Sequence, residues 1–158
     1  MNTYPIVTYP TGSLKEKSFD VDLNTIATKD FQDYLDRMVK TMEVEDGIGL
    51  ASPQIGLNKR VIVCKFGRKT EILLNPKIVK FYDTKIDTEE GCLSIPGVFG
   101  IVTRPKRVIL EGFNRHGRRV QHDLKKMNAV VAQHEIDHLD GILFIDKMHK
   151  LTKGNLDK

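Results

Sequence analysis

The sequence predicts an α+β fold in which antiparallel β-sheets surround a central helix that carries an HExxH motif, with an N-terminal helix packed alongside. Three observations lead to this prediction. Two separated stretches repeat apolar residues at the helical period of 3.6, β-rich segments joined by short turns lie between them, and no repeat or linker divides the chain. Because 158 residues is the usual size of one globular unit, we expect a single domain spanning residues 1–158.

The N-terminal helix is predicted to begin after Thr28 and to stop near Asp46-Gly47. Thr28 can cap the helix, and Asp30 and Asp33 suit the positive end of its dipole. Apolar side chains recur at helical spacing and form one stripe that the fold can bury: Phe31, Tyr34, Leu35, Met38, Val39 and Met42.

Two β-hairpins are predicted in the middle of the chain. The first joins residues 60–66 to residues 70–75 through Gly67-Arg68-Lys69, and the second joins residues 106–113 to residues 118–124 through a turn at residues 114–117. Hairpins pair neighbouring strands in opposite directions, so the sheets are expected to be antiparallel.

A second helix is predicted from about Asp123 to Leu139, ending at Asp140-Gly141. Its apolar side begins with Met127, Val130 and Val131, and the same spacing continues into His134 and His138. The two imidazoles are therefore expected on the buried stripe, within the part of the helix that the sheets cover.

The composition excludes several classes of protein. The formal net charge is +4, and no apolar run approaches the roughly 20 residues that a membrane-spanning helix needs. The N-terminal residues do not resemble a targeting signal, so we expect a cytoplasmic protein with no membrane contact. Basic clusters at residues 65–69, 104–107 and 115–119 are interpreted as solvated faces, with transient ribosome contact as the alternative. We expect a monomer with no specific nucleic-acid partner.

The two cysteines lie in different contexts, and a disulfide is not the expected state in a reducing compartment. Cys64 falls within a predicted strand with no histidine or turn beside it, which predicts a buried structural thiol. His116 and His122 flank the second hairpin turn and are expected at or near the surface, without a role in metal binding.

The strongest chemical signal is HExxH, formed by His134, Glu135 and His138. On a helix, residues four apart project from one face, so the two imidazoles can hold one metal ion. Glu135 points to the flank, where its carboxylate can reach a metal-bound water as a general base. Asp137 on the same helix either pairs with an arginine such as Arg104 or faces solvent.

A catalytic site of this kind needs a third protein ligand and one open position. The HExxHxxGxxH pattern holds through Gly141 but fails at Phe144, and no glutamate follows His138. His149 is a weaker downstream candidate, because residues 146–150 look like an exposed tail. Cys92, which follows Gly91 where regular structure is broken, is the best third ligand, with a buried structural cysteine as the alternative.

A third segment, Gly47-Ile48-Gly49-Leu50-Ala51-Ser52-Pro53-Gln54, combines small residues with an amide side chain. It lacks the Gly-Lys-Ser/Thr ending of a phosphate-binding loop, so taken alone it predicts a turn after the first helix. Small residues also permit close approach of a ligand to the backbone, and Gln54 can donate a side-chain N–H.

Taken in order, GIGLASPQ, EGCLS and QHEIDH resemble the motifs of peptide deformylases of the bacterial or phage type. The resemblance extends to YPTGSLKEKSFDV near the N-terminus and to LDGILFID after the last histidine. It implies a metal-dependent hydrolase that removes the N-formyl group from the formyl-methionine of newly made polypeptides and releases formate. The expected ion is Fe(II), one per chain, with Zn(II), Ni(II) and Co(II) as alternatives.

The resemblance also implies the role of each site residue. The metal ligands would be Cys92, His134 and His138. The Gln54 side chain and the backbone N–H of Leu93 would bind the formyl oxygen as it becomes negative, while Glu135 takes a proton from the attacking water. Backbone groups around Ile48, Gly49 and Gly91 would hold the peptide as an added strand, and an apolar pocket would hold the methionine side chain.

The chain departs from the family pattern at three places. Ser52 stands where a second alanine is usual, and Phe99 stands where many relatives carry arginine or another polar residue near the substrate. The C-terminal helix common in bacterial members is expected to be absent or very short, as in a compact variant. Two other functions stay open: a non-catalytic metal-binding or ribosome-associated protein, and an HExxH endopeptidase.

Overall fold

The computed structural model describes residues 2–156, which form two antiparallel sheets, three α-helices and three short 3-10 helices. In chain order the elements are η1 (Gly12–Lys15), η2 (Leu23–Thr25), α1 (Lys29–Val44), β1 (Gly49–Ala51), η3 (Ser52–Ile55), β2 (Val61–Phe66), β3 (Lys69–Phe81), β4 (Lys85–Cys92), β5 (Ile95–Pro105), β6 (Arg107–Phe113), β7 (Arg119–Lys125), α2 (Met127–Leu139), α3 (Phe144–Lys147) and β8 (Lys150–Lys153). Within residues 2–156, no helix has the length and apolar character needed to cross a membrane.

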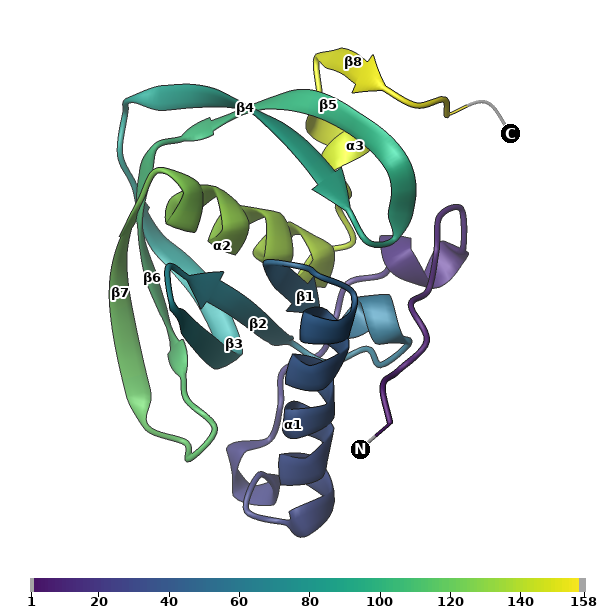
Figure 1. The fold of residues 1–158 in the computed structure, drawn as a ribbon. Helices are drawn as coiled ribbons and strands as arrows, with labels where there is room; N and C mark the ends of the chain where they lie inside the picture. Colours follow the sequence, from purple (N-terminus) through teal and green to yellow (C-terminus); the bar gives the residue numbers. More distant parts are fainter. Residues whose placement is uncertain (1, 157–158) are drawn as a thin grey trace.

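The two sheets lie around α2, as predicted. The larger sheet has the strand order β1-β2-β3-β6-β7, and the smaller has the order β4-β5-β8. In Figure 1, α2 lies between them, with β4, β5 and β8 above it and β1 to β3 below. Because β1 and β4 are each the outermost strand of their sheet, each has one edge that pairs with no other described strand.

Helix α1 confirms the prediction of a helix that begins after Thr28 and ends near Asp46. The Thr28 hydroxyl accepts a hydrogen bond from the backbone N–H of Phe31 at 3.2 Å and so caps the helix. Leu35, Met38 and Met42 are fully buried on the expected stripe. They belong to a core cluster that contains Leu50 of β1, so α1 supports the segment that begins the candidate site.

Both predicted hairpins are present. Strand β2 pairs with β3 and β6 pairs with β7, each pair antiparallel. Strand β3 continues to Phe81, beyond the predicted end at Asn75, because its pairing with β6 resumes after a register shift between Leu74 and Lys77. Cys64 is fully buried in β2, which confirms its interpretation as a structural thiol.

The start of the second helix was predicted too early. Residues 123–125 belong to β7, and α2 begins only at Met127, after Lys126 takes the positive φ angle of 56°. The chain therefore turns sharply from strand to helix at Lys126. Ala129, Ala132 and Ile136 of α2 then pack in one core cluster with apolar residues of the larger sheet, which fixes the helix between the two layers.

The C-terminal part is more ordered than predicted. Instead of an exposed tail at residues 146–150, the chain forms the short helix α3 and then β8, which pairs antiparallel with β5. Phe144 of α3 is buried in a core cluster with Val98 and Val102 of β5. After α3, the described chain thus continues as an added strand of the smaller sheet rather than as a further helix.

Candidate functional site

The structure brings Cys92, His134 and His138 together. The Cys92 sulfur and one ring nitrogen from each histidine lie within 4.8 Å of one another, and Cys92 Sγ is 3.3 Å from His138 Nε2. Cys92 is the last residue of β4, and one turn of α2 presents both imidazoles from the same face. A thiolate with two imidazoles is a donor set suited to Zn(II) or Fe(II), so these residues fit a metal ion.

The protonation states of the two imidazoles differ. Burial lowers the pKa of His138 well below its ordinary value, which leaves the ring neutral, the form that binds metals. Burial also acts to lower the pKa of His134, but contacts with Cys92 and Glu90 outweigh it and raise that pKa. Metal binding at His134 would therefore compete with protonation of that ring.

Glu135 presents a buried carboxylate beside the two imidazoles. Its Oε1 atom is buried and has no hydrogen-bond partner among residues 2–156, and burial raises the pKa of the group to about 7. Gly49 of β1 packs directly against this carboxylate. A carboxyl group whose pKa lies near neutrality can both accept and return a proton, as a general acid–base catalyst must.

Gln54 directs its amide toward the same centre. It belongs to η3, where its Oε1 accepts a hydrogen bond from the backbone N–H of Ala51 at 2.9 Å. The Nε2 group donates to Ser94 Oγ at 3.2 Å and to Cys92 Sγ at 3.4 Å. Since the carbonyl end is held by the backbone, the N–H end is fixed toward the cysteine. Leu93 follows Cys92 in the turn between β4 and β5.

A buried ionic network behind the histidines was missed from the sequence. Glu90 Oε1 lies 2.9 Å from His134 Nδ1, and the same carboxylate accepts two hydrogen bonds from Arg104, from Nε at 2.5 Å and from Nη2 at 2.9 Å. Arg104 Nη1 also donates to Asp137 at 2.9 Å, which confirms the first of the two alternatives for Asp137. The network fixes the orientation of the His134 ring.

The sequence did contain a signal for this network. Side chains alternate between the two faces of a strand, and Glu90 is the buried position of β4, with its carboxylate against His134 of α2. On β5 the buried positions Val98, Gly100 and Val102 continue the same alternation to Arg104, whose side chain is only 2% exposed. A charge at an inward position of a strand indicates a buried partner.

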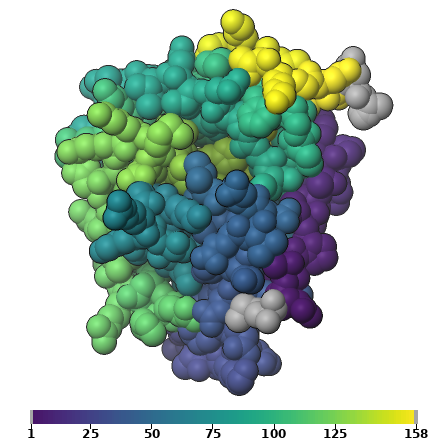
Figure 2. All heavy atoms as spheres, viewed as in Figure 1, coloured from purple at the N-terminus to yellow at the C-terminus, as the bar shows by residue number. Residues whose placement is uncertain are grey.

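A cleft of about 570 Å³ opens over Cys92 and His134. In Figure 2 it is the hollow at the centre of the face, between the teal strands of the smaller sheet and the blue segment around β1, with yellow-green atoms of α2 behind it. Ile48 and Gly49 border it from the β1 side, and Gly91 borders it from β4. The two unpaired strand edges therefore flank the same cleft.

The floor of the cleft is apolar near the metal-ligand group. Leu93, Val130 and Val131 contribute to it, together with Met127, which was expected to be buried but is 49% exposed. Phe99 lines the cleft beside Gly91. This size and mixture of apolar walls with a few polar groups is typical of a small-ligand or peptide side-chain pocket.

Other candidates from the sequence lie outside the cleft. His116 is exposed, and His149 contacts Thr103 and Asp87 on the outer surface. His122 is half-buried next to Phe66. Ser52, the unusual residue of its motif, accepts a hydrogen bond from the Tyr34 hydroxyl at 2.6 Å, so it connects η3 to α1 and does not line the cleft.

Comparison with known proteins agrees with this geometry. The sequence model of the polypeptide deformylase family matches residues 3–154. A peptide deformylase from Fusobacterium nucleatum is 45% identical over 156 residues, which cover 98% of this chain and 89% of the relative.

Solved structures of peptide deformylases share the fold. The enzyme from Thermotoga maritima has a TM-score of 0.89 and 33% identity, over 94% of this chain and 99% of that one. A structure from Acinetobacter baumannii with bound Met-Ala-Ser has a TM-score of 0.89 and 29% identity, over 93% of this chain and 99% of that one. The motifs, the fold and these matches together establish that this chain belongs to the polypeptide deformylase family.

Proposed function

We propose that this chain removes the N-formyl group from the formyl-methionine of newly made polypeptides and releases formate, with residues 1–158 acting as one catalytic domain. The observation that carries the proposal is the meeting of Cys92, His134 and His138 within 4.8 Å, at a cleft that Cys92 and His134 line together with Gln54 and Glu135. Family membership supports the same reaction. The bound Met-Ala-Ser of the Acinetobacter baumannii enzyme has the form of a deformylated peptide.

Cys92, His134 and His138 would hold one divalent ion per chain. Fe(II) is the native ion in this proposal, and the softness of the donor set also accommodates Zn(II), Ni(II) and Co(II). When bound, such an ion acidifies a water molecule and polarises a carbonyl group. The Glu90 carboxylate at Nδ1 supports His134 as a ligand, because a second partner on the far nitrogen fixes the tautomer and ring orientation.

Glu135 would manage the proton of the reaction. Its buried carboxylate accepts a proton from the attacking water and later delivers one to the leaving amine of the methionine. A pKa of about 7, raised by burial, suits both directions of transfer at neutral pH. The unpartnered Oε1 supports this role, because in the described residues no donor competes with water for that atom.

Gln54 and Leu93 would stabilise the negative charge that develops on the formyl oxygen. The Gln54 amide is held in place through Ala51 and Ser94, and the N–H that contacts Cys92 Sγ would pass to the formyl oxygen when the charge appears. The backbone N–H of Leu93 would supply the second donor from the turn after Cys92.

The peptide would bind as an extended strand between β1 and β4. Backbone groups around Ile48 and Gly49 on one edge and Gly91 on the other border the cleft and belong to outermost strands. Leu93, Val130 and Val131 would form the apolar pocket for the methionine side chain. Main-chain pairing is independent of peptide sequence, which suits an enzyme that processes many different polypeptides.

The cellular setting of the proposal is the cytoplasm, where the enzyme would act as a monomer on peptides leaving the ribosome. A transient ribosome contact would use the basic clusters at residues 65–69 and 115–119, since Arg104 of the third cluster is buried. No specific nucleic-acid sequence is needed for such an encounter, because clustered lysines and arginines attract phosphate without reading bases.

Formate release decides between this function and its two rivals. The iron- or zinc-loaded protein is incubated with formyl-Met-Ala and, separately, with an unformylated peptide that carries internal bonds. A deformylase releases formate from the first and leaves the second intact. Cleavage of an internal bond would identify an endopeptidase, and a protein inactive on both would fit the non-catalytic alternative.

A further inference from the structure

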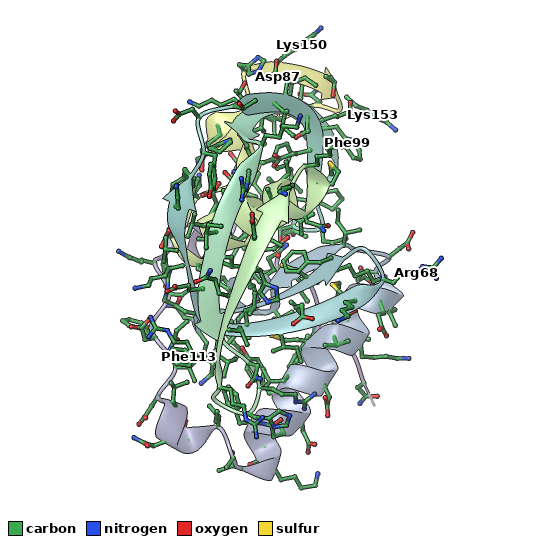
Figure 3. All side chains as sticks on the ribbon, turned by 90° about the vertical axis from the view of Figure 1, so that its left-hand side faces the viewer. Arg68, Asp87, Phe99, Phe113, Lys150 and Lys153 are labelled. Carbon is green, nitrogen blue, oxygen red and sulfur yellow. The ribbon has the colours of Figure 1, made fainter. Side chains whose placement is uncertain are left out.

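The C-terminal strand contacts the wall of the cleft that Glu89 and Phe99 form. Thr152 of β8 donates a hydrogen bond from Oγ1 to Glu89 Oε2 at 2.5 Å, and Lys153 Nζ lies 5.6 Å from the centre of the Phe99 ring. Glu89 and Phe99 both line the cleft, whereas Thr152 and Lys153 do not. Figure 3 shows Phe99 and Lys153 together at the end formed by the smaller sheet. Strand β8 therefore reaches the cleft through two intermediary side chains.

The residue after β8 is held by a third close contact. Gly154 has a φ angle of 89° and lies so near the backbone of Gly97 that a Cβ atom would overlap the Gly97 carbonyl oxygen. Gly97 is also a lining residue of the cleft. Three cleft positions are thus in contact with the consecutive residues 152–154, which fixes the register of the segment against this wall.

The wall itself is closely packed around Phe99. A Cβ atom at Gly91 would lie 2.5 Å from Cε1 of the Phe99 ring, so the ring covers the backbone of Gly91. Gly91 belongs to the strand edge along which the peptide is proposed to bind. A movement of Phe99 would therefore change the surface that meets the peptide directly beyond the metal ligands.

The distance along β4 indicates which part of the peptide meets this wall. A strand advances about 3.3 Å per residue, so Glu89 lies roughly 10 Å from Cys92 along β4. A peptide extended beside β4, with its formyl group at Cys92, would place methionine near Gly91. Its second and third residues would then reach Phe99 and Glu89. A substrate with only one residue after methionine would meet the wall at Phe99 alone, and a third residue is needed to reach Glu89.

We propose that Thr152 and Lys153 are positioning residues, which hold Glu89 and Phe99 as a wall that binds the second and third residues of the formylated peptide. The substrate class that benefits is formylated peptides of three or more residues, relative to formyl-dipeptides. This inference rests on the proposed function. Under this proposal, Thr152 and Lys153 contribute to peptide binding and have no part in the chemical step.

The test compares substrate lengths in the metal-loaded, full-length protein. In the double variant Thr152→Val with Lys153→Gln, kcat/KM for formyl-Met-Ala-Ser-Ala should fall about fivefold, mainly through KM, since an exposed hydrogen bond and cation–π contact are each weak. For formyl-Met-Ala, kcat/KM should stay within about twofold of wild type. Metal content should not change.

Two controls separate positioning from general stability. Thr152→Ser with Lys153→Arg keeps the hydroxyl and the cation and should restore the wild-type preference for the longer substrate. Lys150→Ala alters the same strand at a side chain that extends into solvent in Figure 3, and it should leave both substrates unaffected. If the double variant unfolds, Thr152→Val alone serves for the comparison, because Thr152 is exposed and contacts Glu89, which only the third peptide residue reaches.

The outcomes are distinct. Equal losses on both substrates, or no loss on either, would overturn the positioning role while leaving deformylation intact. Failure of the wild-type protein to release formate from any formylated peptide would instead overturn the proposed function.

Discussion

Gly49 lies directly against the Glu135 side chain, so a Cβ atom at Gly49 would lie 2.9 Å from both Cγ and Cδ of that glutamate and still closer to Oε2. The glycine thus sets the position of the proposed proton-transfer group from the neighbouring strand. It also explains why the motif of small residues and the HExxH helix, far apart in the sequence, belong to one site.

The first prediction concerns this contact. Gly49→Ala should reduce formate release about 100-fold, because displacement of a catalytic group by about 1 Å can cost that much, while metal content stays at the wild-type level. Gly12→Ala is the matched control, since a Cβ atom there would meet nothing within 4 Å. Glu135→Ala should also retain metal and release almost no formate. Wild-type turnover in Gly49→Ala would show that Glu135 can move without consequence.

The second prediction concerns the amide of Gln54. Gln54→Ala should lower kcat about 10²- to 10³-fold, the usual effect of removing one oxyanion donor, with a much smaller change in bound metal. Gln54→Glu is the sharper companion, because it keeps the shape and lacks the N–H donors. Metal analysis beside steady-state kinetics separates the effects. A parallel loss of metal and activity would instead make Gln54 a support for Cys92, which its Nε2 contacts at 3.4 Å.

The sequence predicted the elements that local chemistry specifies. Thr28 and the apolar stripe of α1 were found because caps and periodicity are local signals, and the turns of both hairpins were found for the same reason. The start of α2 was missed because residues 123–125 pair with β6 in the larger sheet, and strand pairing outweighed the helical pattern. Periodicity does not reveal such partners.

The candidate site shows the same division. Spacing four apart on one helix predicted the meeting of His134 and His138, and Cys92, which was predicted as the best third ligand, joins them from the end of β4. The Glu90–Arg104 pair was not predicted, because it joins two strands whose register the sequence does not give. Residues 146–150 were predicted as an exposed tail; most of them are exposed, but they belong to the end of α3 and the start of β8, and only pairing with β5 defines that strand.

The third prediction concerns the buried pair behind His134. Glu90→Gln would leave the Arg104 side chain, 2% exposed, without its closest countercharge, and should lower the free energy of unfolding by about 3–5 kcal/mol. It should also weaken metal affinity about 10- to 100-fold through His134. Asp137→Asn should lower the free energy of unfolding by less than Glu90→Gln does. It should leave turnover unchanged, because Asp137 contacts Arg104 but not His134. Urea unfolding and metal titration of both variants measure these effects, and equal metal affinities in the two would contradict the role of Glu90.

The fourth prediction uses the two thiols as reporters of the metal site. Cys64 is fully buried, and burial raises the pKa of its thiol well above the ordinary value, so iodoacetamide should not modify it in the folded protein at pH 8. Cys92 is only partly buried and lines the cleft, so it should be alkylated once a chelator has removed the ion. Zinc added before the reagent should slow its alkylation, because coordination draws electron density from the thiolate sulfur to the cation and so lowers its nucleophilicity. Mass spectrometry of digested protein assigns the label, and Cys64→Ala should give the same pattern.

Alkylation of Cys92 at equal rates with and without zinc would remove that residue from the ligand set.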